Sequence, residues 1–252
     1  MNLCDFLNPI IIISRLLGLA PFTVVLHKFT GTKVYELSKF WLIYTIIFIL
    51  FQIVLQISVV YKTNFESNEV VVTKLGDYGS HICLTSVVIM EIVALHNSKK
   101  LTTALNKLSL IRLGNLSNKS NEPVMKFVSF ASASFVILTI ILSTLFLFRS
   151  SGFKSDNSFF TLLFITKFPS MILPGVQFIN FFAVIKYKFQ ILNSNLISKH
   201  SYKNVDHNIN KRKFTKVISS IHCSLSELAE ELNYLFHAQI TMSIALDFMQ
   251  FT

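Results

Sequence analysis

The sequence predicts an all-α fold, a polytopic bundle of membrane-spanning helices, and three observations lead to that prediction. Only 14% of the 252 residues are charged and 52% are hydrophobic, whereas a soluble domain carries about 25% charged residues. Several apolar runs reach the ~20 residues that a helix needs to cross a bilayer core. Lys and Arg gather in alternate segments between these runs, which is typical of multi-pass membrane proteins.

The first element is an apolar run at residues 9–27 that contains Arg15. A cleaved signal peptide is disfavoured, because the residues before this run include an acid and no Lys or Arg, and because Arg15 interrupts the apolar core. A spanning helix would place Arg15 inside hydrocarbon at a cost of a few kcal/mol. We therefore expect an interfacial or re-entrant segment with Arg15 at the lipid headgroups.

Five membrane spans are predicted, at about residues 40–61, 77–97, 127–148, 160–186 and 234–252. The first is uncharged and ends at Tyr61 and Lys62, an aromatic and a cation that suit the interface. The second contains Glu91, and the fourth contains Lys167 and two prolines that predict a kink. The fifth contains Asp247 and reaches the last residue of the sequence. All five belong to a single domain, residues 1–252.

The distribution of Lys and Arg predicts the orientation. Of the 23 cations, four precede the first span, six lie between the second and third, and eight lie from residue 186 onwards, where the fourth span ends. Cytoplasmic loops carry the excess of Lys and Arg, so the N-terminus is expected in the cytoplasm. The glycosylation sequons at Asn115 and Asn118 then lie on the cytoplasmic side, and we expect neither to be modified.

Residues 187–233 predict a cytoplasmic basic linker followed by a helix. The linker suggests attraction to anionic lipid of the inner leaflet, with a nucleic-acid-binding arm as the disfavoured alternative. Beyond it, apolar residues recur every three or four positions: Val217, Ile221, Leu225, Leu228, Leu232 and Leu235. This spacing forms one apolar helix face, which we expect to pack on the inner ends of other helices.

No pattern in the sequence indicates an enzyme. There is no nucleophile elbow, P-loop, GxGxxG or HExxH motif. Cys4, Cys83 and Cys223 are scattered and odd in number, so neither a disulfide framework nor a metal site is indicated. We expect no catalytic residue, no metal and no cofactor.

The remaining candidates for a specific site are polar residues within the spans, which mark functional sites in many membrane proteins. We predict ligand contacts by His81, Lys167 and Gln177. Each has a simpler alternative: solvation at the outer mouth for His81, snorkelling to the outer surface for Lys167, and an interhelical hydrogen bond for Gln177. Glu91 is placed nearer the cytoplasmic end of its span, with a role in the interface or in helix pairing.

Two motifs in the sequence match the pattern of a known family. The run ISRLLGLAPF precedes the first strong span, and its residues Ser14, Arg15, Gly18, Pro21 and Phe22 resemble the N-terminal signature of insect gustatory receptors. The sequence LNYLFHAQ resembles the family's fifth helix, and the matching residues are Leu232, Asn233, Phe236 and Gln239.

The resemblance implies a seven-span chemoreceptor fold with an intracellular N-terminus, of which about five spans are present here. The Thr-Tyr…Gln-Phe motif of the family's seventh span has no counterpart, since no Thr-Tyr precedes Gln250 and Phe251; we therefore expect a chain that is incomplete at its C-terminus.

The function that the resemblance implies is a gustatory receptor subunit in the plasma membrane, a ligand-gated cation channel type that detects a small-molecule tastant and takes part in the perception of taste. Its partners would be the tastant, the lipid bilayer and other gustatory receptor subunits in a homo- or hetero-tetramer, with no nucleic acid. The alternative is a non-receptor membrane protein, either a transporter fragment or an accessory helical bundle. The sequence lacks the internal repeats that transporters usually show.

Overall fold

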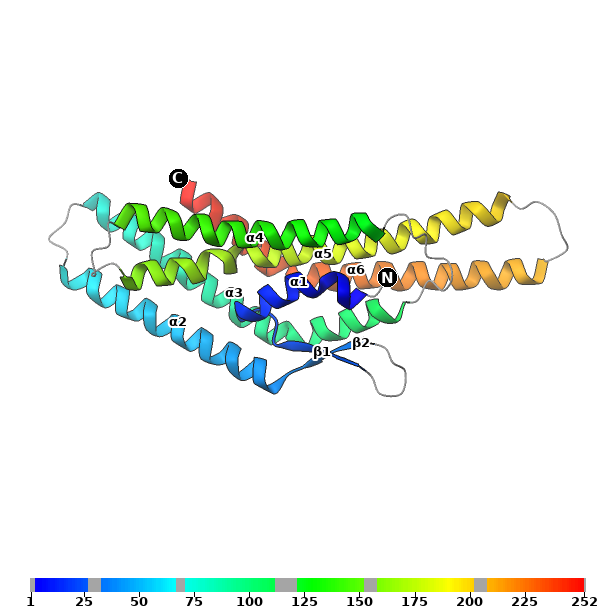
Figure 1. The fold of residues 1–252 in the computed structure, drawn as a ribbon, viewed down its shortest axis with the longest axis horizontal. Coiled ribbons are helices and arrows are strands. Elements are labelled where there is room, and N and C mark those ends of the chain that lie inside the picture. The colour runs from blue at the N-terminus through cyan, green and yellow to red at the C-terminus, as the bar shows by residue number, and fades with distance from the viewer. Residues whose placement is uncertain are drawn as a thin grey trace.

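A computed structural model describes residues 3–26, 33–66, 71–111, 122–151, 158–201 and 208–251. In these ranges the chain forms a bundle of long helices that run along one axis (Figure 1). The elements in order are α1 (Leu3–Leu16), β1 (Phe22–Leu26), β2 (Lys33–Leu37), α2 (Lys39–Glu66), α3 (Val71–Leu110), α4 (Glu122–Ser151), α5 (Ser158–Ser201) and α6 (Asn208–Phe251). The predicted helical membrane bundle is confirmed.

Three helices are long and apolar enough to cross a membrane, in the segments Lys39–Ser58 of α2, Lys126–Leu145 of α4 and Lys167–Ser194 of α5. They correspond to the predicted spans 40–61, 127–148 and 160–186. The share of each segment buried inside the protein is 61% for α5 but only 22% for α2 and 17% for α4. Helix α5 is therefore central, while α2 and α4 keep broad apolar faces exposed.

The predicted spans 77–97 and 234–252 lie on α3 and α6. Both regions are helical, yet the described residues of these two helices contain no stretch that meets the same test of length and hydropathy. The crossing of the bilayer by these two helices stays a prediction.

The N-terminal segment differs from the expected interfacial run at residues 9–27. It forms a helix, α1, followed by an antiparallel hairpin in which Phe22 pairs with Leu37 and Leu26 pairs with Lys33. Helix α1 packs against α4 and α5, and Leu7 and Ile10 are fully buried. The apolar residues of this segment thus contact protein, because α4 and α5 offer apolar surfaces against which they are buried.

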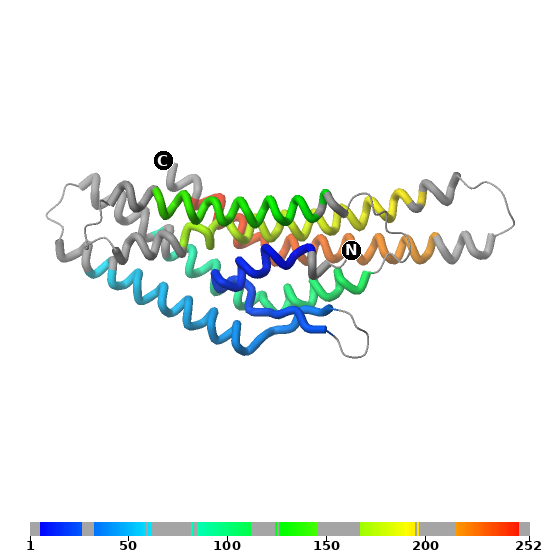
Figure 2. Tube along the Cα trace, in the orientation of Figure 1, coloured from blue at the N-terminus to red at the C-terminus, as the bar shows by residue number. Residues whose placement is uncertain are grey.

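The hairpin leads directly into the start of α2 (Figure 2). A side chain of α3 holds the hairpin in place, and a side chain of α5 holds the end of α3. Asn106 accepts the Tyr35 N–H at 2.7 Å and donates to the Tyr35 carbonyl at 2.8 Å, as a neighbouring strand would. Lys188 of α5 donates to the carbonyls of Leu108 and Ile111, at 2.7 and 2.6 Å, where α3 ends. These carbonyls lack partners within the helix, and the cation also favours this negative end of the helix dipole.

The predicted helix at residues 187–233 is part of α5 and α6, which extend together past the hairpin (Figure 1). Most of the predicted apolar face of α6 is buried, at 0% exposure for Leu225 and Leu232. The prediction that Val217 belongs to this face is wrong, because Val217 is 56% exposed while Ile218 is 5% exposed. The helix has 3.6 residues per turn, so the buried face is shifted by one position at this end.

Several predicted features fall where the structure is not described. The sequons at Asn115 and Asn118, and residues 202–207 of the basic linker, lie outside the described residues. For His81 and Asp247 the helix backbone is described but the side chain is not.

Candidate functional site

The N-terminal motif forms the turn that ends α1. The Gly18 N–H donates to the Arg15 carbonyl at 3.0 Å and the Leu19 N–H donates to the Ser14 carbonyl at 2.7 Å, which is the pattern of a Schellman motif. Gly18 has φ = +71°, a conformation that only glycine adopts without strain. The carbonyl of Leu16, the last residue of α1, accepts a hydrogen bond from the Tyr44 hydroxyl at 2.8 Å.

The other residues of this motif position the hairpin. Arg15 Nε donates to the Phe22 carbonyl at 2.6 Å, and burial lowers the pKa of the Arg15 guanidinium, with a smaller opposing effect of Tyr35. The Pro21 carbonyl accepts the N–H of Ser38 at 3.0 Å. Phe22 is 1% exposed and its ring meets that of Tyr35 edge to face, at 5.7 Å between centroids. Arg15 therefore bonds to the protein backbone through Nε, and its contact with lipid headgroups stays a prediction.

Gln177 joins α5 to α1. Its Nε2 donates to Ser14 Oγ at 2.7 Å, and the Ser14 hydroxyl donates in turn to the Ile10 carbonyl at 2.6 Å. Gln177 is 4% exposed. Of the two roles considered from the sequence, the structure shows the interhelical hydrogen bond.

Four side chains form what we call the buried polar cluster: Gln52 of α2, Glu91 of α3, and Lys167 and Ser170 of α5. Each is at most 1% exposed. Gln52 Nε2 donates to Glu91 Oε1 at 2.9 Å. The Ser170 hydroxyl also hydrogen-bonds to the Glu91 carboxylate, and the Lys167 ammonium lies close enough to interact with it electrostatically. The cluster thus links three helices through one carboxylate.

This cluster corrects one expectation and confirms another. Lys167 does not snorkel to the surface, because its side chain is 1% exposed. Glu91 pairs α3 with α2 through Gln52, which is the helix-pairing role considered from the sequence; its place nearer the cytoplasmic end of the span stays a prediction. An isolated charge is costly inside a bilayer, so opposite charges in this setting pair with each other. The sequence indicated Glu91 and Lys167 separately but not Gln52. The feature that could have identified Gln52 is its polar amide side chain within an otherwise uncharged apolar run.

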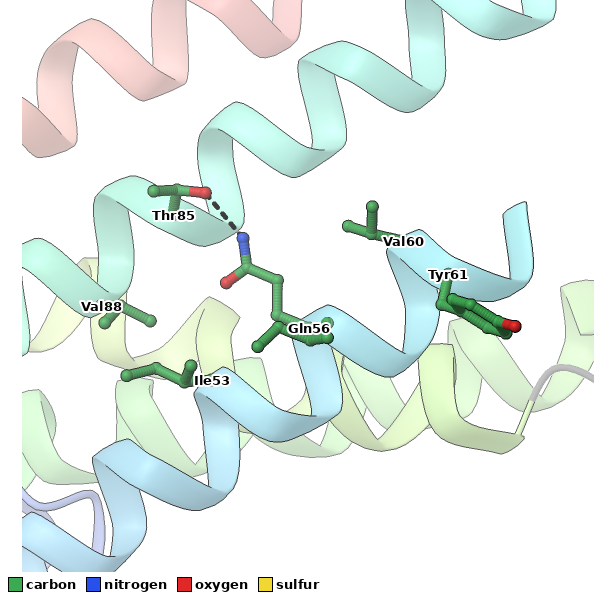
Figure 3. A pocket seen from close by; sticks show the side chains of 7 residues that line it. Ile53, Gln56, Val60, Tyr61, Thr85 and Val88 are labelled. Atoms are coloured by element: carbon green, nitrogen blue, oxygen red, sulfur yellow. Dashed lines mark hydrogen bonds between the residues drawn. The ribbon is translucent and has the colours of Figure 1, made fainter. Parts of the chain in front are cut away.

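A pocket of about 440 Å³ lies between α2 and α3. Seven residues line it: Ile53, Gln56, Ile57, Val60, Tyr61, Thr85 and Val88. Gln56 and Thr85 face each other across it, and Gln56 Nε2 donates to Thr85 Oγ1 at 2.6 Å (Figure 3). His81, the predicted residue of the outer mouth, is one helical turn before Thr85 on α3.

The C-terminal motif packs α6 on the helices that carry the cluster. Leu232 is 0% exposed, and the Phe236 ring lies 5.7 Å from that of Phe181 on α5. Gln239 Nε2 donates to the carbonyl of Met90, the residue before Glu91, at 3.5 Å. Asn233 is exposed. Three of the four motif residues therefore contact the core.

The arrangement suits binding and conformational change. Among the described residues, no three His, Cys, Asp or Glu side chains are placed to hold a metal ion. The features that stand out are a buried charged pair between helices and a pocket with mostly apolar walls. Such combinations are found at ligand sites of membrane proteins.

The comparisons with known proteins identify the family. A family model described as 7tm chemosensory receptor matches residues 7–252. A search of curated proteins finds no match. The family match covers nearly all of the chain and includes both sequence motifs, the buried polar cluster and the pocket. The chain therefore belongs to the seven-transmembrane chemosensory receptor family.

Proposed function

We propose that this chain is a gustatory receptor subunit, of the ligand-gated cation channel type, that detects a small-molecule tastant. The match of the chemosensory receptor family to residues 7–252 carries this proposal. The Ser-Arg…Gly…Pro-Phe motif supports the gustatory branch of the family. Its residues form one turn that joins α1, the hairpin and α2.

The buried polar cluster supplies a mechanism by which a ligand changes the conformation. A ligand shifts an equilibrium between two conformations only if it binds one of them better. Glu91 contacts α2 through Gln52 and α5 through Ser170. A tastant that replaces Glu91 as the hydrogen-bond partner of these groups therefore favours a conformation in which the distances between α2, α3 and α5 are changed.

We place the subunit in the plasma membrane with its N-terminus in the cytoplasm. The cations of the described inner segments support this orientation, with Lys99, Lys100 and Lys107 on α3 and Lys188 on α5. The paired extensions of α5 and α6 lie at the same end as the hairpin (Figure 1). Such extensions offer a surface for assembly into a tetramer with identical or related subunits.

The test is a ligand-evoked current in cells that express this chain, alone and together with a full-length subunit of the same family. The panel contains sugars, bitter compounds and amines, and surface labelling confirms delivery. We expect an inward cation current with at least one class, which is absent in cells that express the full-length subunit alone. Silence towards the whole panel despite surface delivery would remove the receptor proposal.

A further inference from the structure

The pocket and the buried polar cluster lie along the same seam between α2 and α3. On α2, Gln52 is four residues before Gln56; on α3, Glu91 is three residues after Val88. Residues three or four apart share one face of a helix and are separated by about one turn. Gln56 and Val88 line the pocket. The cluster is therefore one turn further along the seam, towards the inner end of α2.

Two buried oxygen atoms of the cluster have no hydrogen-bond partner within the described part of the chain. They are Gln52 Oε1 and Glu91 Oε2. Both side chains are 0% exposed. Buried acceptors without a donor are uncommon in native proteins, so these two atoms indicate where the donor group of a ligand would bind.

The residues that line the pocket indicate the chemical character of the rest of the ligand. Five of the seven lining residues are aliphatic or aromatic, and the polar pair Gln56 and Thr85 bond to each other. A sugar would leave most of its hydroxyl groups without partners against such walls, which is unfavourable. The positive charge of Lys167 balances the negative charge of Glu91, so the cluster does not require a cationic ligand.

We propose that the seam between α2 and α3 binds a small, neutral, mainly apolar molecule through one hydroxyl or amide N–H donor. The apolar part occupies the pocket and the donor reaches Gln52 and Glu91. Ile57 and Tyr61 at the pocket are 62% and 66% exposed, which leaves a route from the lipid for such a ligand. This inference rests on the proposed receptor function and narrows its ligand class.

The experiment is photoaffinity labelling of the whole chain in lipid nanodiscs with a diazirine derivative of octanol. Mass spectrometry then locates the label. We expect it on residues 53–61 and 85–91, with displacement by 1-octanol. Its isomer 1-methoxyheptane has no hydrogen-bond donor. It should displace the label only at a roughly tenfold higher concentration, which is the ratio expected for the loss of one hydrogen bond to a charged acceptor. Glucose should not displace the label. Tighter binding of octylamine than of octanol would overturn the neutral ligand class.

Variants separate the site from general effects on the fold. Val88→Trp fills the pocket and should abolish labelling, whereas Ile141→Trp, at a position of α4 that is 49% exposed, should not. Gln52→Met removes one of the two acceptors at similar volume and should reduce the tenfold preference for octanol over its isomer. Labelling that is unaffected by Val88→Trp, or an isomer ratio of one in the wild-type chain, would overturn the proposal.

The labelling does not depend on a current, so the two proposals fail separately. Label at the seam without an evoked current supports this site and removes the receptor function. An evoked current with label only outside the seam supports the receptor function and overturns this site.

Discussion

Replacement of Gly18 by alanine tests the turn that joins α1 to the rest of the bundle. Gly18 has φ = +71°, and a Cβ added there would lie 3.0 Å from Cδ1 of Phe48 on α2. An L-residue other than glycine loses about 1–2 kcal/mol in this left-handed conformation. The close contact adds to that loss, because the Phe48 ring must move by a few tenths of an ångström. We expect Gly18→Ala to lower the free energy of unfolding by about 2 kcal/mol.

The assay is thermal unfolding of the purified chain in detergent. In a chain of this size a loss of 1 kcal/mol lowers the melting temperature by about 2–4 °C, so Gly18→Ala should lower it by roughly 4–8 °C. Gly175 is the matched control, because it lies inside α5 and nothing lies within 4 Å of a Cβ added there. Gly175→Ala should raise the stability by about 0.5–1 kcal/mol, since alanine favours helix more than glycine does.

Two further variants divide the effect at Gly18 into its parts. Asparagine tolerates the left-handed conformation better than alanine, so Gly18→Asn should be less destabilising than Gly18→Ala. In a Phe48→Leu background the steric part should disappear and the conformational part remain. If Gly18→Ala melts at the same temperature as the wild-type chain, the proposed turn does not form.

Three other predictions concern the hairpin, the buried charges and an exposed thiol. Asn106→Leu removes two hydrogen bonds to the backbone of β2 and should cost about 2 kcal/mol in thermal unfolding, at ~1 kcal/mol for each bond; an unchanged melting temperature would contradict this. Lys167→Met leaves the buried carboxylate of Glu91 without its cation and should cost ~3–5 kcal/mol, while the double variant with Glu91→Leu should recover much of the loss; strict additivity in this double-mutant cycle would refute the pairing. Glu227 accepts a hydrogen bond from the Cys223 thiol at 3.4 Å and raises the pKa of that thiol. The thiolate fraction at neutral pH is then below the ordinary one, so maleimide labelling should be slow, rise with pH and speed up in Glu227→Gln, in a chain whose other two cysteines are serine; equal rates with and without Glu227 would be the contrary result.

The helices were predictable because bilayer-length apolar runs and charge distribution act locally along the sequence. The predicted spans 40–61, 127–148 and 160–186 overlap the apolar segments Lys39–Ser58 of α2, Lys126–Leu145 of α4 and Lys167–Ser194 of α5. The hairpin was not predicted, although Thr23, Val24 and Val25 face a second run with Val34 across a short polar segment. A hydropathy pattern long enough for a membrane segment concealed the β-branched residues that favour strands.

The site was only partly predictable for a different reason. A single sequence shows which polar residues lie within a span, and it indicated Glu91, Lys167 and Gln177. It does not show which of them meet, because contacts between α2, α3 and α5 depend on how the helices pack. The pairing of Glu91 with Gln52, 39 residues away, and of Gln177 with Ser14, 163 residues away, comes from the tertiary structure.

The most direct test of the central claim is the tastant-evoked current of the wild-type chain, recorded beside the double variant Lys167→Met/Glu91→Leu at equal surface level. Both are expressed with a full-length subunit of the family. If the chain is a chemosensory receptor whose cluster responds to ligand, the wild-type chain gives a concentration-dependent current. The double variant then needs at least ~10-fold more tastant for half of its maximal response, which corresponds to 1.4 kcal/mol. The absence of any current from the surface-delivered wild-type chain, or identical curves for the two, would contradict the account.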